Sequence, residues 1–299
     1  MTGSLPKTPI ALVVSDVDGT LVTRDKRITP RARKAIDDLR ARGVAFTIIS
    51  ARPPLGIHKL VDTLDLEGPV GAVNGGALIR SDLTILERKL IEPNAARGSV
   101  AFLRSKGIDA WLFTETEWFL RDPNGAHVDH EKKTLAMDFI QVEEFDDAHY
   151  QHVLKIVGAS HDHPHLARCE IELQEKLGAR ASATRSQSYY LDVTHPEAVK
   201  GNGLLGIARL LRVPPEAVLS LGDGTNDITM LQRAGFSVAM GNASDTVKAT
   251  ASAVTDDCDS EGFAKAIERY VLSDPRLPAG PAQAPRLHEE LAASQDMSR

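Results

Sequence analysis

Short apolar runs alternate with amphipathic segments near both ends of the chain. Residues 10–15 (IALVVS) and 44–49 (VAFTII) are continuous apolar runs, which are typical of strands buried on both faces of a parallel sheet. Between them, Thr29 and Pro30 form the N-cap and first residue of a predicted helix. This helix has four apolar residues on one face, namely Ala32, Ala35, Ile36 and Leu39. The order strand, helix, strand predicts a right-handed βαβ unit.

The C-terminal third of the chain repeats this alternation. The patterns predict helices at residues 203–211, 228–234 and 261–272, and strands at residues 218–221 and 236–240. Alternating elements of this kind predict an α/β fold with a doubly wound, Rossmann-like parallel sheet.

The middle of the chain has a different pattern. Strand-like segments at residues 110–113, 117–120 and 189–193 alternate with two or three helical ones, which favours an α+β module with one covered sheet face. We therefore expect a discontinuous core at residues 1–81 and 194–273, interrupted by an inserted cap at 82–193. Residues 274–299 are rich in Pro, Ala and polar residues and are expected to be a poorly ordered tail, with a short helix near Leu287 to Ala293.

Composition narrows the class of protein. The 299 residues are 42% hydrophobic and 25% charged, which is the balance of a globular protein. The net charge of −6 argues against a nucleic-acid partner. No apolar run reaches the ~20 residues of a membrane span, and the polar N-terminus does not resemble a secretory signal. The two cysteines, Cys169 and Cys258, indicate no disulfide framework, so a cytoplasmic location is expected.

Two carboxylates follow the first predicted strand. Asp16 and Asp18 stand one residue apart, and Gly19 allows a tight turn that brings the backbone close to a ligand. Ligands of open α/β sheets bind beyond the carboxyl ends of the strands, so this position favours a chemical role. In isolation, both carboxylates are also compatible with an Asx turn that satisfies loop amides.

Three further loops carry polar residues at comparable places. Ser50 ends the second predicted strand, where it can donate to a phosphate oxygen or cap a turn. Lys200 precedes a predicted helix, where its charge and the free amides of the helix start suit an anion, although a lone lysine at such a position is more often a solvated surface residue. Residues 222–227 have the sequence GDGTND. Its two acidic residues, Asp223 and Asp227, are suited to holding a hydrated magnesium ion. The alternative is a glycine-rich turn in which Asp227 is a helix cap. Since order, placement and residue type agree, we expect the four loops to meet at one edge of the sheet.

These motifs resemble the haloacid dehalogenase superfamily, and specifically its Cof-type phosphatases with a C2-type cap. The resemblance rests on SDVDGTL, ISARP, KGNGL and GDGTNDITML and covers roughly residues 9–79 and 194–270. It extends to the position and size of the insertion. Asn74-Gly75-Gly76 matches a turn that family members show before the cap, and Ser50 stands where many members have threonine.

The resemblance implies a magnesium-dependent phosphatase that acts on a small phosphate ester. Asp16 would attack phosphorus to form an aspartyl-phosphate, and Asp18 would serve as the acid and base. Lys200 would stabilise the transferring group. The implied Mg²⁺ set is Asp16, the Asp18 carbonyl, Asp223 and, through water, Asp227; the implied substrate-binding set is Ser50, Arg52, Asn74, Gly75 and Asn226. A monomer or homodimer without nucleic-acid or membrane partners is expected.

The predicted cap carries weaker signals. Trp111, Trp118, Arg121 and His127 are candidates for a pocket lining, although aromatic residues in a small sheet are more often core. The run from His161 to His165 is compatible with a metal site, but its proline favours a solvated turn.

Two rival functions remain open at this stage. One is a phosphomannomutase-like phosphotransferase, which would return the phosphoryl group to a sugar instead of to water. The other is a non-catalytic sensor of a phosphorylated ligand. Retention of both Asp16 and Asp18 argues against the sensor, because a binding module has little use for an acid and base.

Overall fold

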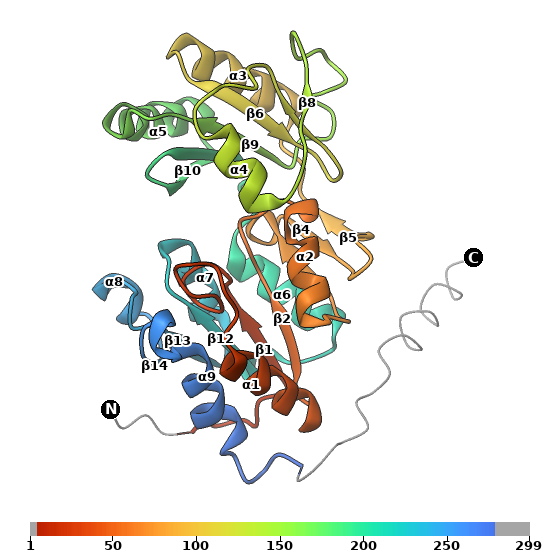
Figure 1. The fold of residues 1–299 in the computed structure, drawn as a ribbon, viewed down its shortest axis with the longest axis vertical. Helices are drawn as coiled ribbons and strands as arrows, with labels where there is room; N and C mark the ends of the chain where they lie inside the picture. The colour runs from red at the N-terminus through yellow and green to blue at the C-terminus, as the bar shows by residue number, and fades with distance from the viewer. Residues whose placement is uncertain (1–4, 279–299) are drawn as a thin grey trace, which may run out of the picture. The chain divides into compact units, whose positions relative to one another are not determined.

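The structure is a computed structural model that describes residues 5–278 (Figure 1). These residues form two compact units. The first comprises the chain up to Ile49, Leu64–Val70 and the chain from Lys200 onward, and the second comprises Ser50–Thr63 and Gly71–Val199. The helix predicted near Leu287 to Ala293, with all of the tail beyond residue 278, lies outside the described residues.

The first unit contains a parallel five-stranded sheet in the order β14-β13-β12-β1-β2. Its strands are β1 (Leu12–Ser15), β2 (Ala45–Ile48), β12 (Val218–Gly222), β13 (Phe236–Ala239) and β14 (Ala253–Val254). β1 lies between β12 and β2, and Ser15 pairs with Leu221 of β12. The residues that follow β1 and β12 therefore emerge side by side at the carboxyl edge of the sheet. The predicted α/β fold class is confirmed.

Within residues 5–278, this unit has five α-helices: α1 (Pro30–Ala41), α6 (Lys200–Leu210), α7 (Ile228–Arg233), α8 (Asp245–Lys248) and α9 (Gly262–Ile267). α1 begins where Thr29 accepts a hydrogen bond from the amide of Ala32 at 3.1 Å, and the predicted face of α1 is the buried one. α1 packs beside α9, and α6 beside α7. α6 begins three residues before the predicted start, so Lys200 belongs to the helix. The final predicted helix continues beyond α9 as a π-helix, Glu268–Leu272.

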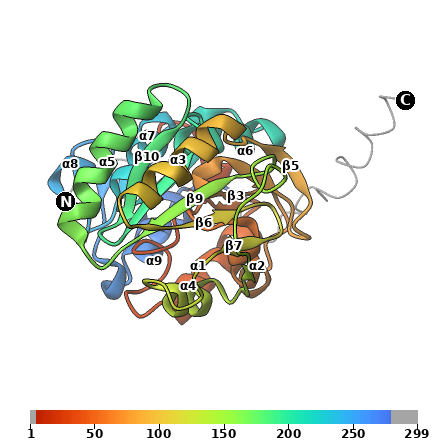
Figure 2. The ribbon, with the colours of Figure 1, turned by 90° about the horizontal axis from the view of Figure 1, so that it is seen from above.

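The second unit is built on a six-stranded sheet in the order β10-β11-β9-β6-β7-β8, in which only the β7–β8 pair is parallel. Its strands are β6 (Asp109–Phe113), β7 (Trp118–Leu120), β8 (Ile140–Gln141), β9 (Lys155–Ala159), β10 (Ser182–Gln187) and β11 (Tyr190–Thr194). Helices α3 (Pro93–Ser105) and α5 (His163–Leu177) pack on one face, as Figure 2 shows. α4 (Val128–Leu135) contributes to the apolar cluster of the other face.

The remainder of this unit joins the first unit in sequence. α2 (Pro54–Leu64) is followed by the small sheet β3-β4-β5, formed by Val70–Ala72, Ala77–Ile79 and Ile85–Arg88.

The prediction of a solvated turn at His161 to His165 was wrong, because α5 begins at His163 with Pro164 in its first turn. Asp162 caps this helix by accepting a hydrogen bond from the amide of His165 at 2.9 Å. Proline is well tolerated there because the first helical amides have no partner within the helix.

The chain remains packed beyond the last helix of the first unit. Asp274 is 1% exposed, and Arg276 pairs with it while donating to the carbonyls of Pro6 and Lys7 at 2.7 and 2.8 Å. None of the described helices is both long and apolar enough to span a membrane.

Candidate active site

A buried lysine joins two of the predicted acidic residues. Lys200 is 1% exposed, and its ammonium group donates hydrogen bonds to Asp16 Oδ1 and to Asp227 Oδ1, the latter at 2.7 Å. Asp16 follows β1, Lys200 opens α6, and Asp227 lies in the turn after β12. Three distant parts of the sequence thus meet at one charge cluster. Buried charges are stable only when paired in this way.

The loop after β12 is organised by Asp227. Its second carboxylate oxygen, Oδ2, accepts hydrogen bonds from the amides of Asp223 and Gly224 at 2.9 and 2.8 Å. A Cβ added to Gly222 would lie 2.5 Å from Asp227 Cβ, so only glycine allows this close approach. Asn226 lies in the same turn, Thr225–Asp227, with an exposed side chain.

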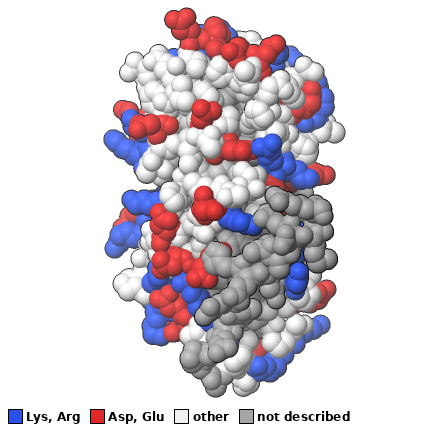
Figure 3. All heavy atoms as spheres, turned by 90° about the vertical axis from the view of Figure 1, so that its right-hand side faces the viewer, with Lys and Arg blue, Asp and Glu red and all other residues white. Residues whose placement is uncertain are grey.

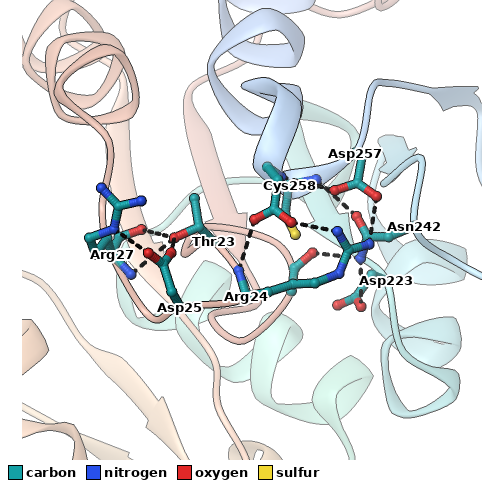
Figure 4. A network of polar contacts seen from close by, with 10 residues as sticks. Thr23, Arg24, Asp25, Arg27, Asp223, Asn242, Asp257 and Cys258 are labelled. Carbon is teal, nitrogen blue, oxygen red and sulfur yellow. Dashed lines mark hydrogen bonds and ion pairs between the residues drawn. The ribbon is translucent and has the colours of Figure 1, made fainter.

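Asp223 is held from two sides. Thr20 Oγ1 donates to its Oδ1 at 3.0 Å, and Asn242 Nδ2 donates to its Oδ2 at 3.0 Å and to the Gly19 carbonyl at 2.9 Å. Asn242 in turn accepts a hydrogen bond from the amide of Cys258 (Figure 4). The sequence analysis missed Asn242, although it stands just beyond a predicted strand, the position that identified the other candidates.

Gly19 itself has φ of +88°, and a Cβ there would lie 2.5 Å from Asp223 Oδ2. Both the backbone conformation and the close approach therefore require glycine.

Asp18 lies beside a loop that the sequence analysis also overlooked. Lys26 Nζ is 2.7 Å from Asp18 Oδ1. The loop is held by a hydrogen bond from the Thr23 amide to the Arg27 carbonyl at 3.0 Å, and Arg24 pairs with Asp257 at 2.7 Å (Figure 4). These ion pairs are exposed and contribute little to stability, but they fix the loop that follows Asp18.

Burial and like charges change the acidity of this cluster. Burial raises the pKa of Asp16 to about 8, because the loss of water together with Asp227 and Asp223 outweighs the attraction of Lys200. Burial and the neighbouring Asp227 also raise the pKa of Asp223. The pKa of Lys200 is raised as well, because Asp16 and Asp227 overcome the effect of its burial. When Asp16, Asp223 and Asp227 are all ionised, their three negative charges exceed the single positive charge of Lys200, so the cluster favours a cation.

The carboxylates fit a divalent metal ion. Asp16, Asp223 and Asp227 each offer an oxygen within 4.8 Å of the others, and such oxygen ligands suit Mg²⁺. A second group, Asp257, Cys258 and Asp259, fits less well, because Arg24 pairs with both of its carboxylates. Burial also raises the pKa of the Cys258 thiol to about 11. Within residues 5–278, no histidine belongs to either group.

The predicted substrate-binding residues of the second unit gather at one place. Ser50 Oγ accepts a hydrogen bond from the Arg52 amide at 3.2 Å, and the Ser50 carbonyl accepts one from the Asn74 amide at 2.8 Å. Asn74 and Gly75 form a turn with φ of 55° and 81°. The loops that carry Ser50, Arg52, Asn74 and Gly75 are therefore joined by backbone hydrogen bonds.

The candidates in the predicted cap separate into different environments. Trp111 and Trp118 are 1% and 0% exposed and belong to the apolar cluster beside α4. Arg121 donates to the Glu143 carbonyl at 2.9 Å and pairs with Glu144. His127 stacks on Tyr189, with ring centroids 4.6 Å apart.

Known proteins share this arrangement over nearly the whole chain. Residues 13–267 match the family of haloacid dehalogenase-like hydrolases. The chain belongs to this family. Among curated members, this hydrolase is 29% identical to a putative phosphatase of Haemophilus influenzae over 259 residues, which cover 86% of this chain and 96% of that protein. It is 28% identical to the 5-amino-6-(5-phospho-D-ribitylamino)uracil phosphatase YcsE of Bacillus subtilis over 264 residues, covering 88% and 96%.

Solved structures of family members agree with this fold. This hydrolase superposes on a haloacid dehalogenase-like hydrolase from Bacteroides thetaiotaomicron with a TM-score of 0.80 and 27% identity, covering 87% and 99% of the two chains. It superposes on a sugar phosphatase of haloacid dehalogenase subclass IIB with a TM-score of 0.75 and 26% identity, covering 87% and 98%. The predicted family is confirmed.

Proposed function

We propose that this hydrolase is a magnesium-dependent phosphatase that cleaves small phosphorylated metabolites through an aspartyl-phosphate at Asp16. The observation that carries the proposal is the buried contact of Lys200 with Asp16 and Asp227, next to Asp223. A nucleophilic carboxylate, a fixed ammonium group and an oxygen-rich cation site are the parts that phosphoryl transfer requires. Relatives named as phosphatases support the same reaction.

In the first proposed step, a carboxylate oxygen of Asp16 attacks phosphorus and forms the acyl-phosphate bond. The bond between phosphorus and the ester oxygen breaks, and Asp18 gives its proton to the departing alkoxide. Asp18 suits this role because it stands two residues from the nucleophile and is more exposed than Asp16.

In the second proposed step, water attacks phosphorus while Asp18 takes its proton. The bond between phosphorus and Asp16 breaks, which frees inorganic phosphate and restores both carboxyl groups. No co-reactant other than water is consumed.

Charge neutralisation is the main task of the surrounding residues. Lys200 stabilises the negative charge of the transferring group and lowers the repulsion between Asp16 and an anionic substrate. Asp16, the Asp18 carbonyl, Asp223 and Asp227 would hold Mg²⁺, which would supply a Lewis acid for the phosphate oxygens. Ser50, Arg52, Asn74, Gly75 and Asn226 are proposed to bind the substrate, and the α+β unit to act as the cap that excludes water.

Charged side chains are visible on one face of the molecule in Figure 3. Among the described atoms of that face, basic and acidic side chains are interspersed.

Phosphate release from a panel of sugar phosphates, nucleotides, pyridoxal phosphate and flavin mononucleotide tests the proposal. We expect turnover that requires Mg²⁺ and yields free phosphate. An isomerised sugar phosphate would instead identify the phosphomannomutase-like reaction. Binding without turnover of any substrate would identify a sensor.

Mg²⁺ binding should be linked to release of a proton. Because the pKa of Asp16 is raised to about 8 in the metal-free protein, below that pH the carboxyl group must lose its proton before it can bind the metal. The apparent Mg²⁺ affinity should therefore rise as the pH increases toward about 8 and level off above it. Calorimetric titration in buffers of different ionisation enthalpy measures the proton release, and a pH-independent affinity would contradict the assignment.

Asn242 should control metal affinity through Asp223. Its amide fixes one carboxylate oxygen of Asp223, and loss of such an outer partner typically weakens metal binding by about 10-fold or more. In thermal unfolding, the Mg²⁺ concentration that gives half of the metal-induced rise in the midpoint should therefore be about 10-fold or more higher for Asn242→Ala than for the wild type. Asn94→Ala, an exposed site on α3, serves as the matched control. Equal Mg²⁺ responses of the two variants would refute the role of Asn242.

A further inference from the structure

The six-stranded sheet of the α+β unit has edge strands of very different length. β8, at one edge, has two residues, whereas β10, at the other edge, has six. The last four residues of β10 are exposed. A long, exposed edge strand presents backbone N–H and C=O groups that can pair with a strand of another chain. β10 is therefore the edge of this sheet at which a further strand would add.

Two backbone amides of β10 point away from the sheet. β10 pairs on one side with β11, in a register that places Thr184 opposite Asp192. The amides of Ala183 and Arg185 donate instead to side chains outside the sheet, at 2.8 and 2.9 Å. Residues that face a partner strand alternate with residues that face away from it. The two residues that flank Thr184 are therefore the outward-facing ones.

Both acceptors of these amides belong to α5. Gln174 Oε1 accepts the bond from Ala183, and Glu170 Oε1 accepts the bond from Arg185. α5 lies beside β10 (Figure 1), and the order of the two bonds shows that helix and strand run in opposite directions. Four helical residues rise about 6 Å, and two strand residues span about 6.7 Å. The spacing of the acceptors along α5 therefore matches the spacing of the amides along β10.

Each acceptor side chain makes a second contact that fixes it. Glu170 Oε2 accepts a hydrogen bond from Arg185 Nε at 2.8 Å, so one carboxylate binds both the backbone and the side chain of Arg185. Gln174 Nε2 donates to the carbonyl of Gly178 at 3.0 Å. A carboxylate that accepts a backbone amide forms a charge-assisted bond, which is stronger than a neutral one. The outward amides of β10 are therefore occupied by side chains held in place.

We propose that this acceptor pair, Glu170 and Gln174, prevents β10 from pairing with β10 of a second copy of this chain. Two antiparallel copies related by a two-fold axis present the same surface to each other. With the axis at Thr184, Ala183 of one copy would lie opposite Arg185 of the other. Each outward amide would then meet a carbonyl, and the two arginines would not face each other. The inference concerns assembly and does not depend on the proposed phosphatase function.

The mass of a variant without the acceptor pair tests the proposal. Glu170→Ala/Gln174→Ala should approach twice the wild-type mass in light scattering as the protein concentration rises. Arg185→Pro, added to this variant, should restore the wild-type mass. Proline has no N–H, and edge strands tolerate it where the N–H faces away from the ladder. An unchanged mass of the folded double variant, or an association that Arg185→Pro does not abolish, would overturn the proposal.

Three single variants serve as controls. Glu170→Gln keeps an acceptor oxygen without the charge. Glu172→Ala removes another carboxylate of α5, one that pairs with Lys106 of α3 at 2.5 Å. Both should keep the wild-type mass, and association of either one would show that the charge of α5, and not the occupation of the amides, controls assembly. Arg185→Pro alone should also keep the wild-type mass, and a halved mass would mean that β10 already pairs in the wild type.

Hydrogen exchange followed by NMR tests the acceptor pair in the wild-type chain, without a substitution that could prevent folding. Although Arg185 is exposed, its amide should exchange about tenfold or more slowly than in an unstructured peptide. In Gln174→Leu, exchange should accelerate at Ala183 while the amide of Arg185 stays protected. Exchange of the wild-type Arg185 amide at the rate of an unstructured peptide would contradict the proposal, even if the double variant does not fold.

Discussion

Asp16→Asn is expected to lower phosphate release by about 10⁴-fold or more, the usual effect of removing a covalent nucleophile. The amide has nearly the same shape but cannot attack phosphorus. Asp227 still pairs with Lys200, so the variant should fold and unfold cooperatively. Both properties are measured on one preparation, by phosphate release at saturating Mg²⁺ and by thermal unfolding.

The control for this substitution is Asp37→Asn, an isosteric change at an exposed position of α1. It should leave both turnover and the thermal midpoint near the wild-type values. Full turnover by Asp16→Asn would remove Asp16 from the chemistry and with it the aspartyl-phosphate.

Lys200→Met should damage stability and activity together. Removal of the ammonium group leaves Asp16 and Asp227 buried without their counter-charge, and breaking a buried pair in this way typically costs about 3–5 kcal/mol in the free energy of unfolding. Turnover should fall by about 10²–10³-fold, because a fixed positive charge no longer stabilises the transferring group. Urea unfolding and steady-state kinetics measure the two effects.

Magnesium distinguishes this explanation from simple loss of packing. A bound cation would neutralise the same carboxylates, so Mg²⁺ should raise the thermal midpoint of Lys200→Met more than that of the wild type. Lys34→Met removes an exposed pair with Asp38 and should change the free energy of unfolding by no more than about 0.5 kcal/mol. An equal Mg²⁺ response in all three proteins would show that Lys200 does not compensate the acidic cluster.

The first unit was predictable because strands buried on both faces leave a clear signal. Their apolar runs end sharply at polar residues, and parallel pairing brings those ends to the same edge. Asp16 and Asp223 could therefore be assigned to one cluster before any coordinates were known. Asn242 follows the same rule, but its amide side chain carries no obvious chemistry in the sequence.

A buried ion pair of the α+β unit, in which Lys155 Nζ lies 2.7 Å from Asp192 Oδ2, could not be predicted in this way. Lys155 and Asp192 are separated by 36 residues in the sequence and meet only because β9 and β11 pair in a particular register. The burial of all five residues of β9 also gives no alternation from which the face of Lys155 could be inferred. Contacts between distant strands depend on tertiary packing, which local patterns do not specify.

The most direct test of the central claim is to trap the phosphorylated enzyme and locate the phosphoryl group. Wild-type protein with Mg²⁺ and a substrate is quenched in acid during turnover, digested and sequenced by mass spectrometry, with Asp18→Asn used to slow hydrolysis of the intermediate. We predict one hydroxylamine-sensitive phosphoryl group on Asp16. A phosphoryl group on any other residue, or turnover with no phosphorylated enzyme in either protein, would contradict the account.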